Sequence, residues 1–246
     1  MKKETNTQFF QVDIPEGITS FLEKKSGVFK NNKTPSYGVN QIVRCLRKSY
    51  YEKTKKKRKS SKSLDNLWPT VRGDLLHQMT TAYNWNELDM DFQIPLGDGS
   101  VGTVSGRLDM YDWKTKTIID LKTTKFVRWQ IKQGFLPKLE HILQLQCYDT
   151  MFSQYMPVEN LNIVYADMTD IVTYKVQKRD LTDWIKTRIS EIENSKESKK
   201  IPKGEISGLC KFCKYQTQCF EEGIGLTEKP LSIPKSNESQ TQGERK

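Results

Sequence analysis

Two aspartates within one β-rich stretch could together bind a divalent metal ion, with a lysine beside them. Residues Val104–Lys125 consist of two β-rich runs joined by a short polar turn. With Lys114-Thr115 as a two-residue turn, Asp109 lies directly opposite Asp120, with Cβ atoms roughly 5 Å apart. Because side chains alternate along a strand, Lys122 projects from the same face as Asp120. The hairpin therefore brings two carboxylates and an ammonium group to one patch.

This arrangement is costly unless something compensates the carboxylates. Like charges opposite each other in a sheet repel, and buried carboxylates need a partner. Mg²⁺ or Mn²⁺ would be a suitable partner, because both take hard oxygen ligands, and Lys122 would then orient or activate a metal-bound water. The alternative is a surface hairpin whose aspartates are solvated and screened by Lys122. A register shift of one residue would also turn a side chain to the other face.

A second possible metal centre is formed by cysteines near the C-terminal end. The spacing Cys210-x₂-Cys213-x₅-Cys219 lets three thiolates reach one metal centre, and Cys45 is the obvious candidate for a fourth ligand. Four thiolates suit Zn²⁺ or an iron–sulfur cluster equally well by count. The alternative is three unliganded thiols in a basic loop. We interpret Cys147, inside a predicted helix, as a small buried hydrophobic residue.

Composition favours a polyanionic partner. The 246 residues include 40 basic and 30 acidic side chains, for a net charge of +10 and a pI near 9.2, which favours nucleic acid first and an anionic membrane second. The basic run Lys53–Lys62 could be a solvated loop, a phosphate contact or a nuclear localisation signal. No apolar run approaches the ~20 residues of a membrane helix, and Met1–Thr5 lacks the apolar core of a signal peptide. We therefore expect a cytoplasmic protein with reduced thiols.

Helices and strands must position these groups. Gln144 and Tyr148 are four residues apart on a predicted helix and therefore share a face, and His77 lies on another helix. Helices beside a sheet built largely of hairpins predict an α/β fold with a mixed central sheet flanked by helices. We expect a partly flexible segment over 1–35, one domain over 36–222 and a disordered tail over 223–246. The expected helices cover Ile18–Phe29, Pro35–Tyr51, Trp68–Thr80, Pro137–Tyr155 and Asp180–Glu193, and the further strands cover 91–96, 161–166 and 171–176.

The order of these candidate residues resembles one known family. Gly73-x₃-His77, Asp109, Asp120-x-Lys122 and Gln144-x₃-Tyr148 look like the motifs of RecB-type nucleases of the PD-(D/E)xK superfamily. A lone cysteine before these motifs and three after them resembles the subset that carries a [4Fe–4S] cluster, most closely the CRISPR-associated iron–sulfur exonuclease family. The resemblance covers Ser36–Phe220.

Two positions depart from the pattern. The acidic residue before the lysine is Asp120, where the superfamily often has glutamate. Leu46 follows Cys45, where the CRISPR-associated family commonly has proline. Neither departure removes a required ligand.

The resemblance implies a restriction-endonuclease-like core and a role for each matched residue. His77, Asp109, Asp120 and the backbone carbonyl of Leu121 would hold Mn²⁺ or Mg²⁺, and Lys122 would position the attacking water. Gln144 and Tyr148 would brace the site and the DNA backbone. One [4Fe–4S] cluster, with Zn²⁺ as the alternative, would join the N- and C-terminal segments; its implied ligands are Cys45, Cys210, Cys213 and Cys219.

The resemblance further implies a metal-dependent exonuclease that prefers single-stranded DNA. It implies 5′→3′ cleavage during CRISPR adaptation, in the processing of spacer DNA, with CRISPR integration proteins as candidate partners. Two alternatives remain open. One is a replication or recombination repair nuclease of the same fold, and the other is a non-catalytic Cys₄ adaptor that binds DNA.

Overall fold

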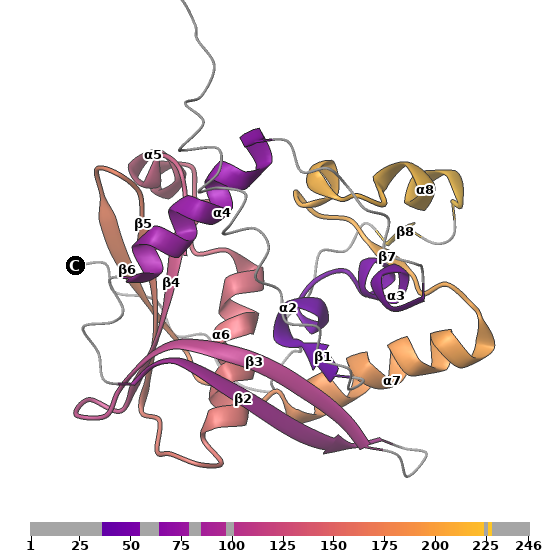
Figure 1. Cartoon of the computed structure of the whole chain (residues 1–246), viewed down its shortest axis with the longest axis horizontal. Helices are drawn as coiled ribbons and strands as arrows, with labels where there is room; N and C mark the ends of the chain where they lie inside the picture. Colours follow the sequence, from indigo (N-terminus) through magenta and orange to yellow (C-terminus); the bar gives the residue numbers. More distant parts are fainter. Residues whose placement is uncertain (1–35, 55–63, 79–84, 97–100, 224–225, 228–246) are drawn as a thin grey trace, which may run out of the picture.

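A six-stranded mixed β-sheet forms the centre of the molecule (Figure 1). The computed structural model describes residues 36–54, 64–78, 85–96, 101–223 and 226–227. The strand order is β1-β3-β4-β5-β6, and β2 also pairs with β3. The pairs β1–β3 and β4–β5 are parallel, whereas β2–β3, β3–β4 and β5–β6 are antiparallel. The strands are β1 (Ser36–Gly38), β2 (Asn86–Pro95), β3 (Val101–Asp112), β4 (Thr117–Thr123), β5 (Asn160–Ala166) and β6 (Ile171–Val176).

Helices cover both faces of this sheet, so the predicted flanked mixed sheet is confirmed (Figure 1). The helices are α2 (Val39–Ile42), α3 (Leu46–Thr54), α4 (Leu64–His77), α5 (Val127–Lys132), α6 (Leu139–Phe152), α7 (Thr182–Ser198) and α8 (Gln216–Glu221), with a 3₁₀ turn η2 (Cys210–Phe212). A small parallel sheet pairs β7 (Gly204–Glu205) with β8 (Leu226–Thr227). None of the helices in the described part of the chain is long and apolar enough to cross a membrane.

The sheet separates two apolar layers of unequal size. The large core contains α6, which crosses from β4 to β5 and is buried at every position from Leu143 to Phe152. On the α4 side, a small cluster formed by Met110, Leu121 and Ala166 packs against Leu76. Because β4 is covered on both faces, its polar side chains lie in a largely dehydrated setting.

The β3–β4 hairpin has the predicted register but a wider turn. The paired residues are Met110–Ile119, Tyr111–Ile118 and Asp112–Thr117, and this register puts Asp109 opposite Asp120, one residue beyond the Met110–Ile119 pair. The turn is four residues, Trp113–Lys116, instead of the expected Lys114-Thr115. The Asp112 carboxylate stabilises the wider turn, because it accepts hydrogen bonds from the Lys114 N–H at 3.0 Å and the Thr115 hydroxyl at 2.7 Å.

Other predicted boundaries shift. The single helix expected over Pro35–Tyr51 is instead β1, α2 and α3, with a break at Val43–Cys45. Arg188 of α7 compensates this break, because its guanidinium donates to the carbonyls of Ile42 at 2.6 Å and Arg44 at 2.5 Å. The strand expected from residue 91 begins at Asn86, and α4 begins before Trp68.

Several sequence predictions concern residues outside the described ranges. These are the helix over Ile18–Phe29, most of the basic run Lys53–Lys62 and the tail from 228 onward.

Candidate active site

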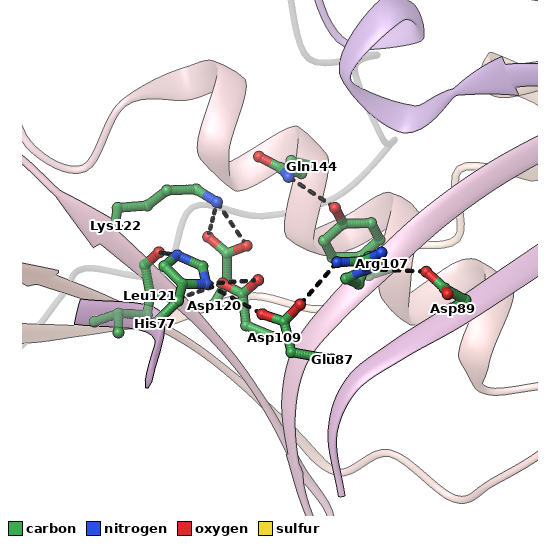
Figure 2. A network of polar contacts seen from close by, with 10 residues as sticks. His77, Glu87, Asp89, Arg107, Asp109, Asp120, Leu121, Lys122 and Gln144 are labelled. Carbon is green, nitrogen blue, oxygen red and sulfur yellow. Dashed lines mark hydrogen bonds and ion pairs between the residues drawn. The ribbon is translucent and has the colours of Figure 1, made fainter. Parts of the chain in front are cut away.

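Residues from α4, the three neighbouring strands β2, β3 and β4, and α6 meet beside one cavity (Figure 2). The cavity has a volume of about 400 Å³. His77, Asp109, Lys122, Gln144 and Tyr148 all line it. The structure therefore gathers most of the sequence-predicted site residues in one place.

Three carboxylates form a row across three adjacent strands. The β2–β3 register pairs Asn86 with Met110 and Leu88 with Leu108, so Glu87 lies across from Asp109. On the other side of β3, the hairpin register places Asp120 across from Asp109. Glu87 was not predicted from the sequence. Its backbone has φ +50°, a left-handed conformation that is uncommon for a residue other than glycine.

His77, the last residue of α4, contacts this row of carboxylates from the helix layer. Its Nδ1 lies 3.6 Å from Glu87 Oε1 and 3.6 Å from Asp109 Oδ1. These three side chains present ligand atoms that all lie within 4.8 Å of one another. The His77 Nε2 also lies 3.0 Å from the carbonyl oxygen of Leu121. An imidazole, carboxylates and a carbonyl form a donor set that fits Mn²⁺ or Mg²⁺.

Asp109 occupies the most perturbed position in the site. It is 8 % exposed, and its Oδ2 accepts a 2.8 Å hydrogen bond from the Leu121 N–H. Burial, followed by the negative charge of Asp120, raises its pKa to about 6. Lys122 and His77 act in the opposite direction. A bound cation would favour the ionised carboxylate, which is the form that serves as a ligand.

Asp120 and Lys122 form a separate, closely held ion pair. The Lys122 Nζ lies 2.8 Å from Oδ1 and 2.7 Å from Oδ2 of Asp120, which is only 1 % exposed. Among the described residues, Asp120 does not join the compact His77–Glu87–Asp109 cluster. The pair therefore lies beside that cluster, with Lys122 at the cavity wall.

Gln144 and Tyr148 share a face of α6, as their spacing predicts, and are joined directly. The Gln144 Nε2 donates to the Tyr148 hydroxyl at 2.8 Å. Gly106 of β3 makes room for the tyrosine ring, because a Cβ at that position would lie 2.7 Å from Tyr148 Cε1. Burial raises the pKa of Tyr148, and Asp120 adds to this shift. The phenol is therefore neutral beside the carboxylates.

Comparisons with known proteins agree with this geometry. A sequence model described as the PD-(D/E)XK nuclease superfamily matches residues 39–220. This chain belongs to the PD-(D/E)XK nuclease superfamily. The match runs from α2 into α8 and includes every site residue described above.

One solved structure is similar to this chain in fold, and a second was matched at a lower score. The crystal structure of SSO0001 matches with a TM-score of 0.65 and 23 % identity, over 82 % of this chain and 96 % of that chain. A phage-related exonuclease from Haemophilus somnus 129PT matches with a TM-score of 0.43 and 15 % identity, over 72 % and 86 % of the two chains. No curated protein matches the sequence.

PD-(D/E)XK nucleases use divalent metals such as Mg²⁺ or Mn²⁺, and the acidic cluster of this family member is suited to bind one. The structure brings His77, Asp109 and the Leu121 carbonyl together, as the sequence predicts, and adds Glu87. It directs Asp120 toward Lys122. Glu87 was missed because its position depends on the β2 register, which begins upstream of the predicted strand.

The four predicted cysteine ligands lie around a second cavity of this nuclease domain. The cavity is about 160 Å³ and mostly apolar, and all four thiols are free and partly buried. Those four residues are Cys45, Cys210, Cys213 and Cys219.

Backbone and side-chain donors already point at three of these sulfurs. Cys45 Sγ accepts from the Glu205 N–H at 3.4 Å, and Cys210 Sγ accepts from the Ser207 N–H at 3.4 Å. The buried Arg47 donates to Cys219 Sγ at 3.2 Å. Burial raises the pKa of the Cys45 thiol, so a metal would be needed to hold it as a thiolate.

Proposed function

We propose that this nuclease-family chain is a metal-dependent exonuclease that hydrolyses phosphodiester bonds in single-stranded DNA. The observation that supports this most directly is the His77–Glu87–Asp109 cluster beside the Asp120–Lys122 pair. His77, Asp109 and Lys122 of these two groups line one cavity. The net charge of +10 suits a DNA substrate.

The proposed ligands of the Mn²⁺ or Mg²⁺ ion are His77, Asp109, Asp120, the Leu121 carbonyl and, from its position, Glu87. When bound, such an ion lowers the pKa of water and neutralises charge on the scissile phosphate. His77 must be neutral to act as a ligand. The hydrogen bond from the Leu121 N–H fixes one Asp109 oxygen, which leaves the other directed toward His77.

Lys122 is the residue proposed to position the attacking water. Its ammonium group is held by both oxygens of Asp120 and cannot swing freely into solvent. The Gln144–Tyr148 pair would brace the site and the DNA backbone from α6, and its hydrogen bond keeps both side chains at the cavity wall.

For the cysteine cavity we propose one structural [4Fe–4S] cluster that joins the N- and C-terminal segments. The support for a cluster is the family resemblance, carried by one cysteine before the nuclease motifs and three after them. By count, four thiolates suit Zn²⁺ equally well. Iron and acid-labile sulfide analysis of anaerobically purified protein therefore tests the assignment.

The family resemblance supports a finer assignment. We propose 5′→3′ cleavage during CRISPR adaptation, in a cytoplasmic protein that acts with integration proteins on spacer DNA. The support is the combined order of the nuclease motifs and the four cysteines in one chain.

The deciding experiment uses single-stranded DNA labelled at its 5′ or 3′ end, with Mn²⁺ or Mg²⁺, and compares wild type with Asp120→Ala. Metal-dependent cleavage that the variant lacks supports the proposal, and the label released first gives the polarity. Bound but uncleaved DNA with both proteins would instead favour the adaptor function.

A further inference from the structure

Three aromatic side chains stand exposed on α5 and the loop that follows it. Phe126, Trp129 and Phe135 are 72 %, 53 % and 54 % exposed. The Trp129 and Phe135 rings lie 5.5 Å apart between centroids, in an edge-on arrangement. We call these three residues the aromatic platform. A group of exposed large aromatic side chains often marks a site of interaction with a partner or ligand.

The segment that carries the platform is rich in basic residues, although Asp167 and Asp170 of the β5–β6 turn also contact it. Between Asp120 and Glu140 the sequence has no acidic residue but contains five basic ones. Lys125 and Lys132 are exposed on either side of Trp129. Arg128 is also largely exposed and pairs with Asp170 of the β5–β6 turn. This charge pattern suits a polyanion and disfavours a second copy of this chain, whose net charge is also positive.

The platform is held rigidly, although its aromatic rings are exposed. The Asp167 carboxylate accepts a 2.7 Å hydrogen bond from the Val127 N–H at the start of α5. Gln130 Nε2 donates to the Thr124 hydroxyl at 2.6 Å. Phe126 has φ +57°, a left-handed conformation that costs free energy in an aromatic residue and that no burial of its ring offsets. Strain of this kind is typical of ligand-binding positions.

The platform also lies next to the proposed catalytic site. Lys122 is near the end of β4, and α5 follows directly, next to the ends of β4 and β5 (Figure 1). Lys125 is three residues beyond Lys122, so their Cα atoms are at most roughly 11 Å apart. A DNA strand whose backbone passes Lys122 can therefore reach the platform.

We infer that the aromatic platform stacks unpaired bases of a single-stranded DNA that enters the site; this inference rests on the proposed nuclease function. Aromatic side chains stack on bases regardless of sequence, while neighbouring basic residues contact the backbone. A duplex keeps its base faces covered by its own stacking. The platform would thereby select single strands.

The test measures binding without cleavage. Wild type, Trp129→Ala and Phe135→Ala are titrated in EDTA with fluorescently labelled oligo-dT, and with a duplex of the same length. We expect each variant to lose about 10-fold in affinity for the single strand and to bind the duplex as wild type does. Trp129→Phe, which keeps an aromatic ring, should retain most of the affinity.

The matched control is Trp113→Ala. Trp113 is 58 % exposed and lies in the turn at the opposite end of β4. It should bind both DNAs as wild type does. Unchanged single-strand affinity in Trp129→Ala and Phe135→Ala would overturn the inference, as would an equal loss for duplex. A concentration-dependent dimer that Trp129→Ala abolishes would overturn it in favour of a self-association surface.

Failure of this inference can be separated from failure of the proposed function. Cleavage of end-labelled DNA by wild type with Mn²⁺ tests the nuclease alone. Normal cleavage together with unaltered binding by the variants refutes only the platform. Absence of cleavage with a selective loss of single-strand binding refutes only the nuclease.

Discussion

Glu87 lies directly across the sheet from Asp109, on the side of β3 opposite to Asp120. The row places three negative charges at one level of the sheet, two of them in buried residues. Lys122 balances Asp120, and Arg107 contacts Glu87 at 2.9 Å. Within the residues that the structure describes, the carboxylate of the buried Asp109 has no such cationic partner at short distance, so a divalent cation between Asp109 and His77 would compensate its charge.

We first predict that Glu87→Gln weakens Mn²⁺ binding by about 10-fold. Losing a charged metal ligand, or a residue that supports one, typically lowers metal affinity by this much. The matched control is Asp89→Asn, because Asp89 also pairs with Arg107, at 2.9 Å, but its side chain is largely exposed. Isothermal titration with Mn²⁺ compares the two. Equal affinities for both variants and wild type would remove Glu87 from the metal site.

Second, the metal-free protein should lose stability as the pH rises from about 4 to 6. The pKa of Asp109 is raised to about 6, so in this window the folded state holds a proton that the unfolded state has released. The stabilising contribution is complete below the ordinary carboxyl pKa and lost above the raised one. Asp109→Asn should flatten this dependence and stabilise the metal-free protein at pH 7.

Urea unfolding across this pH range, with and without Mn²⁺, measures the effect. Mn²⁺ should stabilise wild type at pH 7 and leave Asp109→Asn unchanged, since the amide is a poor substitute for an anionic ligand. A variant that is less stable than metal-free wild type at pH 7 would contradict the assigned pKa direction.

Third, Lys122→Ala should destabilise the fold in addition to stopping cleavage. The substitution leaves the carboxylate of Asp120, which is 1 % exposed, without its ammonium partner. Breaking a buried pair costs about 3–5 kcal/mol. The double variant Asp120→Asn/Lys122→Ala should recover part of this loss, because position 120 then no longer carries an unpaired buried charge. Free energies of unfolding that simply add across the cycle would show that the two residues are not coupled.

Fourth, Gly106→Ala should disturb Tyr148 without touching any proposed metal ligand. The added Cβ would lie 2.7 Å from the tyrosine ring and 3.1 Å from Val39 Cγ2. Overpacking of this kind costs about 1–3 kcal/mol. Gly102→Ala is a comparison on the same strand, with its nearest contact at 3.1 Å to Ile189. Wild-type stability and DNA cleavage in Gly106→Ala would show that the Tyr148 position is not constrained.

Local patterns were sufficient to predict the hairpin that carries Asp109 and Asp120. Side-chain alternation and a turn of even length fix the facing pair, and lengthening the turn symmetrically from two to four residues preserves it. The pairing of Gln144 with Tyr148 likewise follows from helical spacing alone.

Features that depend on distant contacts could not be predicted in this way. Glu87 enters the site through a left-handed backbone conformation at a residue type that gives no hint of one. The helix break at Cys45 is stabilised by Arg188, which lies far along the chain. The strand β1 is only three residues long and is defined by its pairing with β3.

The cysteine cavity also has a consequence for the order in which parts of the protein fold. Cys45 lies between β1 and β2 in the chain and Cys219 lies after β6, yet Arg47 donates to both the backbone carbonyl and the sulfur of Cys219. During synthesis on the ribosome, the segment around Cys45 must wait until Cys219 has emerged. The sheet can therefore form first, and closure of the cysteine cavity is a late step that joins the two ends of a finished nuclease core.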